Sequence, residues 1–128
     1  MKRLIAVAVL ATTPVWADVQ VRDADTIVLN GTPVRFQGVD APELKTRAGK
    51  DAKRWTVIYL RGKKVSCDLT RERSYDRYIG VCYADGQDIG AAVIAAGHAL
   101  DCAQYSGERY RQFEQASAKS RIKRAGYC

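Results

Sequence analysis

Acidic residues and a single arginine are concentrated between residues 23 and 43. Asp23 and Asp25 stand one residue apart, and Asp40 and Glu43 flank an Ala-Pro turn. Arg35 lies between these two acidic groups, among apolar residues. Carboxylate oxygens are the ligands that a hard cation such as calcium prefers, and the planar arginine fork matches two phosphate oxygens. The stretch therefore contains the parts needed to hold a phosphodiester and to neutralise it during hydrolysis.

Each of these residues, taken alone, also has an ordinary structural explanation. Asp23 and Asp25 are common turn formers, and because they stand one residue apart at a strand bend, we expect only one of them to point toward any single site. Asp40 and Glu43 would be loop acids. Arg35 would pair with an acid across the sheet, because an isolated charge among apolar residues is costly. Only the combination of residues distinguishes the two interpretations.

The order of these residues resembles the signature of the staphylococcal nuclease family. Here V-R-D-A-D-T-I (residues 21–27) is followed by V-R-F-Q-G-V-D-A-P-E (residues 34–43), where the family has D-G-D-T and R-x-x-x-x-D-x-P-E. The resemblance implies that Asp25 and Asp40 are side-chain calcium ligands and that Ala41 supplies a backbone carbonyl ligand. It also implies that Glu43 holds or deprotonates the attacking water and that Arg35 clamps the scissile phosphate.

Further positions match the family with departures from its pattern. Tyr75-Asp76-Arg77 stands where the family has Y-G-R, which makes Arg77 the second phosphate clamp. The resemblance implies that Tyr75 hydrogen-bonds a substrate phosphate and that a base stacks on Tyr105. Both tyrosines could equally be packing residues. Asp76 replaces a glycine, and its carboxylate would either pair with Arg77 or repel a phosphate. Ala24 also replaces a glycine, which matters if the bend requires a positive φ.

The elements that must position these residues follow from hydrophobic periodicity. Strand-like alternation covers residues 19–39, with a hairpin turn at Asn30-Gly31, and a helical stripe covers residues 49–60. Two strands, at residues 64–69 and 78–83 and joined by a polar connection at 70–76, precede a helix at 89–96 and a last helix at 106–124. Asp88 is expected to cap the first of these two helices. This order predicts an α+β fold, a five-stranded OB-fold β-barrel with about three helices.

Residues 1–17 have the features of a secretory signal peptide. Lys2 and Arg3 precede an apolar run at residues 4–11, and the segment ends in Val-Trp-Ala. A membrane anchor is the rival interpretation, but the run is much shorter than the roughly 20 apolar residues of a spanning helix. Cleavage would leave residues 18–128 as a single domain, secreted or periplasmic. Loss of two basic residues lowers the formal charge from +7 to +5, which still suits polyanionic partners.

All four cysteines lie in the predicted mature chain. In an oxidising compartment two disulfides are expected, and four cysteines allow three pairings. A zinc site is the competing interpretation, but the sequence has no C-x-x-C or C-x-x-H spacing and only one histidine, His98. The family pattern places Cys67 and Cys82 on neighbouring strands and implies that Cys102 pairs with Cys128.

The resemblance implies a calcium-dependent endonuclease that does not discriminate between DNA and RNA and leaves 3′-phosphate products. Nucleic acid would be its substrate, and the protein would be a monomer. The alternative class is a non-catalytic accessory or binding protein. The ending G-Y-C and the run G-V-C-Y-A-D-G-Q-D-I-G (residues 80–90) also resemble secreted nuclease-like proteins named for the synthesis of succinoglycan, an acidic exopolysaccharide. Glu43 favours the enzyme, because a mere binder has no use for a water-activating carboxylate.

Overall fold

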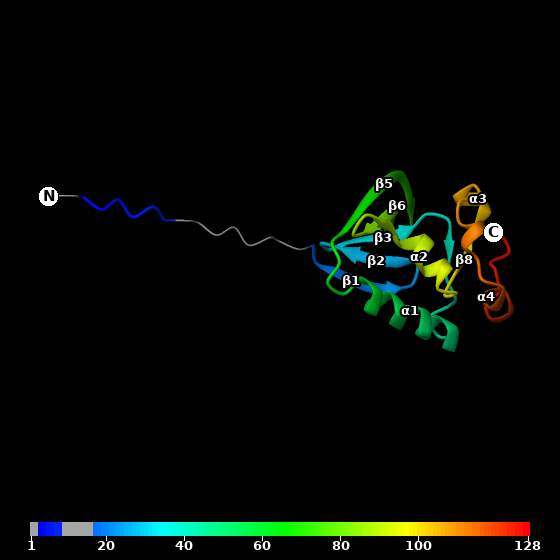
Figure 1. The fold of residues 1–128 in the computed structure, drawn as a ribbon. Coiled ribbons are helices and arrows are strands. Elements are labelled where there is room, and N and C mark those ends of the chain that lie inside the picture. The colour runs from blue at the N-terminus through cyan, green and yellow to red at the C-terminus, as the bar shows by residue number, and fades with distance from the viewer. Residues whose placement is uncertain (1–2, 9–16) are drawn as a thin grey trace.

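A computed structural model describes residues 3–8 and 17–128 of the chain (Figure 1). Residues 3–8 are exposed and have no regular secondary structure. Residues 9–11 of the apolar run and all but the last residue of the predicted cleavage region lie outside the described residues, so the signal peptide and the domain boundary at residue 18 stay predictions. In the part of the chain that the structure describes, no helix is long and apolar enough to cross a membrane.

A mixed β-sheet forms the centre of the fold. Its hydrogen-bonded path runs β1-β2-β3-β6-β5, and β7 pairs with β6. The β1–β2, β2–β3 and β5–β6 pairs are antiparallel, whereas β3 and β6 are parallel. Asn30 and Gly31 both have positive φ, at 48° and 80°, and form the predicted turn between β2 and β3. The strands are β1 (Val19–Asp23), β2 (Thr26–Leu29), β3 (Thr32–Phe36), β5 (Val65–Ser74), β6 (Arg77–Ala84) and β7 (Gln87–Asp88).

The predicted α+β class is confirmed, but no closed barrel is found among the described residues. The pairings end at β1 on one side and at β5 on the other, and β1 instead packs against helix α1 (Arg47–Leu60). A separate two-stranded sheet joins β4 (Val39–Asp40) to β8 (Leu100–Asp101). Barrel closure depends on strand tilt and stagger summed over the whole sheet, which residue alternation does not encode.

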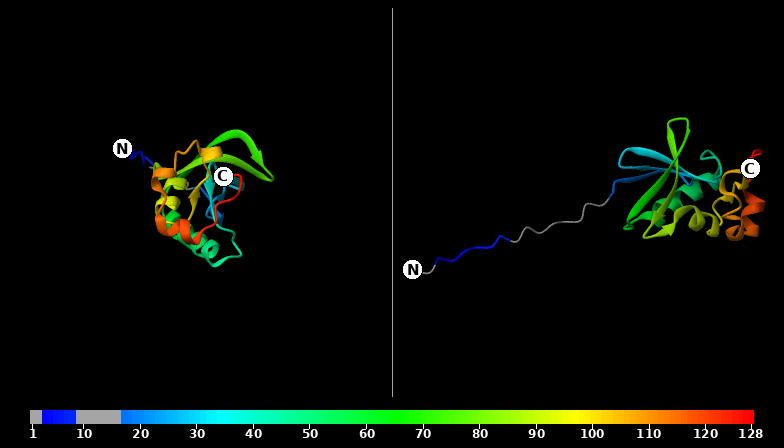
Figure 2. Two further views of the ribbon diagram at one scale, coloured as in Figure 1. Left: turned by 90° about the vertical axis from the view of Figure 1, so that its right-hand side faces the viewer. Right: turned by 90° about the horizontal axis from the view of Figure 1, so that it is seen from above.

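The hairpin between β5 and β6 is longer than predicted. β5 continues to Ser74 and β6 begins at Arg77, so only Tyr75 and Asp76 form the turn, and the expected polar connection over residues 70–76 is wrong. Most of residues 68–76 are exposed, so this part of the strand lacks the apolar alternation by which strands are recognised. The hairpin projects from the body of the domain (Figure 2).

Two helices match their predictions closely. Helix α1 begins after Thr46, whose Oγ1 accepts from the Gly49 N–H at 3.0 Å. Helix α2 (Ile89–Ala95) is capped by Asp88, whose Oδ1 accepts from the Ala91 N–H at 3.2 Å. Both N-terminal caps use the hydroxyl or carboxylate oxygen that such positions favour.

The predicted helix over residues 106–124 is wrong. Gly107 and Glu108 have φ of 64° and 66°, values that a right-handed helix does not tolerate, and the chain breaks there. Tyr110 is buried and its hydroxyl donates to the Asp88 carboxylate, so its position is set by a tertiary contact. The region contains α3 (Ala103–Ser106), the 3₁₀ helix η1 (Arg111–Phe113) and α4 (Ala116–Arg121).

The core fills the space between the sheet and helices α1 and α2. A smaller cluster lies beneath α4 and consists of Leu100, Ala118 and Ile122. Both predicted disulfides are present: Cys67 and Cys82 are cross-strand partners in β5 and β6, and Cys102 is joined to Cys128. Members of the main core include Ile27, Val34, Phe36, Val39, Ala52, Leu60, Ile89, Val93, Ile94 and Tyr110.

A buried carboxylate, that of Glu114, anchors the last part of the chain. It accepts two hydrogen bonds from Arg124, at 2.7 and 3.0 Å, and one from the Asp101 N–H at 2.8 Å. Arg111 and Lys119 lie within 4 Å of it as well. Burial acts to raise the pKa of Glu114, but the hydrogen bonds and the arginine charges outweigh it and leave this pKa below its usual value.

Glu114→Gln is expected to lower the free energy of unfolding at neutral pH by about 2 kcal/mol, because hydrogen bonds to a charged group are lost. A carboxylate whose folded-state pKa is lowered stabilises the protein above its unfolded-state pKa of about 4.3. That stabilisation disappears as the pH falls through the lowered pKa. Urea unfolding between about pH 3 and about pH 7 should therefore show a shallower acid loss in the variant than in wild type. The exposed control Glu108→Gln should follow wild type, and identical pH profiles for Glu114→Gln and wild type would contradict the assignment.

Candidate functional site

Asp25 lies between two arginines that come from different strands. Its Oδ2 is 3.8 Å from Arg35 Nη2, and its Oδ1 is 3.9 Å from Arg77 Nη1. Thr26 connects the group, because its hydroxyl donates to Asp25 Oδ1 at 2.7 Å and accepts from Arg77 Nη1 at 3.0 Å. The side chains of the three charged residues are only 14 to 19% exposed. Sequence positions 25, 35 and 77 thus meet at one place, as predicted.

The sheet explains why these residues meet. Arg35 is the cross-strand partner of Thr26 in β2 and of Ile79 in β6, so it occupies the middle of three adjacent strands. Arg77 opens β6, where its guanidinium also binds Ser74 through the backbone carbonyl at 3.4 Å and the hydroxyl at 3.0 Å. The parallel β3–β6 pair therefore brings both guanidinium groups to the turn that carries Asp25.

Asp23 also belongs to this group, although the sequence predicts that only one of the two aspartates faces the site. The two acids lie at and just after the end of β1, where the β1–β2 register shifts between Val21 and Asp23. Asp23 Oδ1 accepts from the Asp25 N–H at 3.0 Å. Burial, together with hydrogen bonding to Asp25 and the negative charge of Asp25, raises the pKa of Asp23 to about 7, although the Asp25 N–H and Arg77 oppose the shift.

The two departures from the family signature are accommodated. Ala24 is buried and does not have a positive φ, so the bend does not require glycine at this position. Asp76 turns toward Arg22, which donates to both of its carboxylate oxygens at 2.9 and 3.3 Å. This hydrogen-bonded pair lowers the pKa of Asp76. Asp76 thus does not form the pair with Arg77 that its neighbouring position suggested.

Asp40 lies at the same site, on strand β4. Its carboxylate is largely buried, and Oδ2 accepts from the Ala125 N–H at 2.7 Å. Burial raises the pKa of Asp40, against the effects of the Ala125 N–H and the Arg35 charge, and the negative charge of Asp25 adds to the rise. Asp25, Arg35 and Asp40 are therefore close enough for their charges to interact.

Glu43 follows Asp40 in an exposed loop. Among the described residues its carboxylate makes no hydrogen bond or ion pair, so it is open to solvent. Its backbone is held, because the Thr46 N–H donates to the Glu43 carbonyl at 3.0 Å and the Thr46 hydroxyl donates to it at 2.6 Å. Gly49 packs directly beneath, since a Cβ at that position would lie 1.9 Å from the same carbonyl oxygen. The Glu43 carboxylate is thus exposed to solvent, while its backbone carbonyl is hydrogen-bonded and closely packed.

The oxygen atoms at the site are of the type that a hard cation prefers, but they are few. Asp25 and Asp40 offer carboxylate oxygens, and Ala41 follows Asp40 directly with a backbone carbonyl. Among the residues that the structure describes, no three His, Cys, Asp or Glu side chains form a cluster able to hold a metal ion. Oxygen-only ligands of this kind suit calcium or magnesium, and the remaining ligands would have to be water and substrate oxygens.

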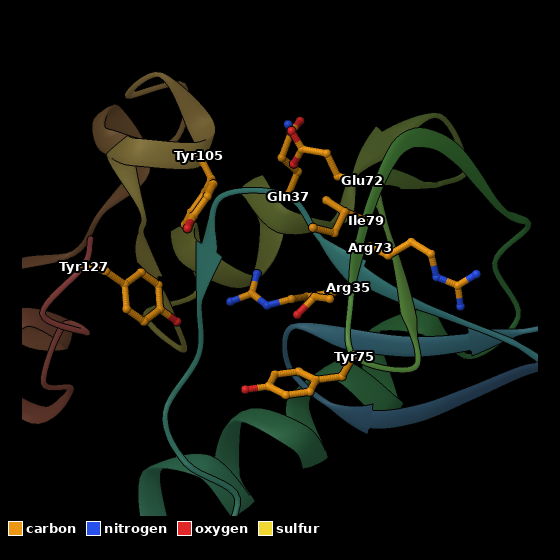
Figure 3. A pocket seen from close by; sticks show the side chains of 9 residues that line it. Arg35, Gln37, Glu72, Arg73, Tyr75, Ile79, Tyr105 and Tyr127 are labelled. Atoms are coloured by element: carbon orange, nitrogen blue, oxygen red, sulfur yellow. The ribbon is translucent and has the colours of Figure 1, made fainter.

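A pocket with a cavity volume of about 360 Å³ opens beside Arg35. Figure 3 shows the Arg35 guanidinium reaching into the space between Tyr75 on one side and Tyr105 and Tyr127 on the other, whereas Arg73 points away from it. These three tyrosines are 95%, 48% and 57% exposed, so none of them is a core residue. The remaining lining residues are Gln37, Glu72, Ser74 and Ile79.

Comparison with known proteins agrees with this geometry. The family described as staphylococcal nuclease homologue matches residues 33–127. The chain belongs to the staphylococcal nuclease family. Among its relatives is the succinoglycan biosynthesis protein ExoI of Rhizobium meliloti (strain 1021), 30% identical over 103 residues that cover 71% of this chain and 54% of ExoI. The probable staphylococcal-like nuclease CAN2 of Oryza sativa subsp. japonica is 31% identical over 75 residues, 59% of this chain and 20% of CAN2. This chain thus spans about half the length of ExoI and less of CAN2.

Within this family member, the residue that sequence reasoning missed at the pocket is Tyr127. The sequence did contain a signal for it: Tyr127 precedes Cys128, and Tyr105 follows Cys102 by three residues. Because Cys102 and Cys128 are bonded, the two tyrosines are brought to the same place, and their ring centroids are 6.2 Å apart. The predicted disulfide therefore already implied a second aromatic residue beside Tyr105.

Gly49→Ala is expected to destabilise the protein, although alanine favours helix over glycine by roughly 1 kcal/mol. The added methyl group would collide with the Glu43 carbonyl, which is backbone and cannot rotate away. A net loss of about 1 to 3 kcal/mol is expected from the forced shift. Chemical denaturation measures it, with Lys50→Ala on the exposed face of the same helix as the control. A gain in stability for Gly49→Ala would show that the loop carrying Glu43 does not rest on α1.

Proposed function

We propose that this protein is an endonuclease that hydrolyses the phosphodiester bonds of DNA and RNA in a calcium-dependent reaction and leaves 3′-phosphate ends. The observation that carries the proposal is that Arg35 and Arg77 both lie within 4 Å of the Asp25 carboxylate. The Asp40 carboxylate is close enough to interact electrostatically with Asp25 and Arg35. Membership of the nuclease family and the nuclease-named relatives support it.

Arg35 and Arg77 would hold the scissile phosphate. Both ion pairs to Asp25 exceed 3.5 Å, so neither guanidinium is fully engaged by the carboxylate. Arg35 Nη1 donates a hydrogen bond to the Phe36 carbonyl, and Arg77 donates hydrogen bonds to the hydroxyls of Ser74 and Thr26. Two preorganised cations in a partly desolvated place stabilise the charge that develops on the phosphoryl oxygens. The protein therefore supplies these cations before substrate arrives.

Glu43 would orient the attacking water and accept its proton. Its exposed carboxylate is not committed to another residue in the described chain, which leaves both oxygens available. Asp25, Asp40 and the Ala41 carbonyl would hold calcium, whose positive charge would further neutralise the phosphate. Oxygen ligands alone do not select calcium over magnesium, so the choice of metal rests on the family resemblance.

Single-stranded or locally opened nucleic acid fits the pocket best. Three exposed tyrosines around Arg35 offer ring faces to bases, and such stacking tolerates every base and either sugar. The formal charge of +7, or +5 after removal of the predicted signal peptide, supports attraction to a polyanion. The disulfides and the predicted signal peptide support action in the periplasm or outside the cell.

The second candidate is a non-catalytic role in exopolysaccharide synthesis. It is favoured by the 30% identity to ExoI, whose name refers to succinoglycan biosynthesis. A basic domain can bind an acidic sugar polymer without any chemistry at Glu43. The two functions are separated by testing whether the residues at the site affect hydrolysis or only binding.

Arg35→Ala and Glu43→Ala are each expected to lower the rate of cleavage of single-stranded DNA by at least about 100-fold, since each removes a preorganised donor or a general base. Arg54→Ala, an exposed change on α1, is the matched control and should retain wild-type activity. Cleavage is measured on the oxidised protein with calcium, and the ends are analysed for 3′-phosphate. Undetectable cleavage by wild type, combined with binding to succinoglycan, would favour the accessory role instead.

Calcium and nucleic acid are expected to bind cooperatively, because two carboxylates and one carbonyl leave the ion incompletely coordinated. In calorimetry on the Glu43→Ala variant, an oligonucleotide should tighten calcium binding by roughly 10-fold or more, and calcium should tighten the oligonucleotide equally. An added Asp40→Asn change should abolish this coupling, whereas Asp76→Asn should not. Chelation should stop hydrolysis by wild type. Equal calcium affinity with and without oligonucleotide would contradict the shared site.

A further inference from the structure

The C-terminal segment, residues 123–128, is held against the candidate site by three separate anchors. Arg124 binds the buried Glu114 carboxylate through both of its Nη atoms, and it also donates to the Asp101 carbonyl. The Ala125 N–H donates to Asp40 Oδ2 at 2.7 Å. The disulfide to Cys102 secures Cys128. A segment of six residues fixed at three points has little freedom to move away from the pocket.

Tyr127 is the side chain that these anchors present. It lies between Ala125 and Cys128, and it lines the pocket together with Tyr105 (Figure 3). The two rings meet edge to face, at an interplanar angle of 69° and a centroid distance of 6.2 Å. A base therefore cannot be sandwiched between them. The two rings instead form a corner in which a base can lie on one ring face and touch the edge of the other.

Packing does not explain the position of Tyr127. Its side chain is 57% exposed and belongs to neither hydrophobic core cluster. Within the described chain its hydroxyl makes no hydrogen bond, unlike the buried hydroxyl of Tyr110, which binds Asp88. A solvent-facing aromatic ring on an anchored segment, next to a pocket that contains Arg35, has the properties of a ligand-stacking residue.

We propose that Tyr127 is a substrate-binding residue that stacks on a base of single-stranded nucleic acid, and that the Cys102–Cys128 disulfide keeps it in the pocket. The proposal rests on the proposed function for its substrate class. The same segment positions Asp40, because the Ala125 N–H donates a hydrogen bond to Asp40 Oδ2. This hydrogen bond does not involve the other carboxylate oxygen, Oδ1. The Cys102–Cys128 disulfide therefore holds a segment that carries both Tyr127 and the N–H that binds Asp40.

The two disulfides provide a matched comparison. Cys67–Cys82 joins β5 to β6 and does not line the pocket of Tyr105 and Tyr127, whereas Cys102–Cys128 ends one residue from Tyr127. Removing either bridge should lower stability, but only removal of the second should weaken nucleic-acid binding. This difference separates a role in the pocket from general stabilisation.

The test measures binding of a fluorescein-labelled oligonucleotide of six deoxythymidines by anisotropy, with chelator present so that no cleavage occurs. Tyr127→Ala is expected to weaken binding by roughly 5-fold to 150-fold, the range that corresponds to losing one aromatic stacking partner of a base. Tyr127→Phe should bind like wild type. Cys102→Ala/Cys128→Ala should show a loss similar to that of Tyr127→Ala, and Cys67→Ala/Cys82→Ala should show none. Thermal unfolding confirms that each variant is folded at the assay temperature.

Abasic substitutions identify the contact directly. Replacing one thymidine at a time by an abasic sugar should weaken wild-type binding at one position, and Tyr127→Ala should be insensitive at that same position. Equal affinity of wild type and folded Tyr127→Ala for the intact oligonucleotide would overturn the proposal, as would equal abasic profiles. Because the assay excludes catalysis, binding that depends on Tyr127 without any cleavage by wild type would refute the nuclease reaction and retain the stacking role. If Tyr127→Ala changes neither cleavage nor binding, the stacking role is refuted and the nuclease reaction is retained.

Discussion

The contacts of Asp25 with Arg35 and Arg77 are long, at 3.8 and 3.9 Å, and they lie in a place that is partly removed from water. At such distances the charges attract one another without consuming the hydrogen-bond donors of either guanidinium. The nearby carboxylates of Asp23 and Asp40 add negative charge that the two arginines do not fully cancel. Burial is the main cause of the raised pKa of both acids, and the negative charge of Asp25 adds to it; a bound cation would oppose both effects. The surrounding strands, loops and C-terminal segment hold these charged side chains in place.

The supports of the site come from all parts of the chain. The β1–β2 bend presents the aspartates, the parallel β3–β6 pair aligns the arginines, and Gly49 allows the loop before α1 to pack closely. Near residue 125, Glu114 and the Cys102–Cys128 disulfide hold the last segment against Asp40. A small domain with a modest core thus uses one buried ion pair and one disulfide to order a surface that hydrophobic packing does not reach.

Sequence reasoning identified Asp25, Arg35, Asp40 and Arg77 because fixed motifs carry them, and the structure brings these four together. It failed where geometry is decided by contacts between distant residues. The register shift near Asp23 places two neighbouring acids together, and the pairing of Asp76 with Arg22 spans positions that no local pattern relates. Likewise, the break at Gly107 and Glu108 depends on backbone conformations, and Tyr110 is fixed there by Asp88. Periodicity reports which faces are apolar, but it does not report such long-range polar contacts.

The parallel pairing of β3 with β6 has a consequence for when the candidate site is assembled. Arg35 and Arg77 meet only when β3 and β6 pair across the segment between them, which contains α1 and β5, since parallel strands need a long crossover. Such distant pairing is reached late in folding, because closing a long loop costs entropy before any contact rewards it. A chain exported unfolded, as the predicted signal peptide implies, would have no assembled site, and the proposed nuclease would become active only after it folds outside the cytoplasm.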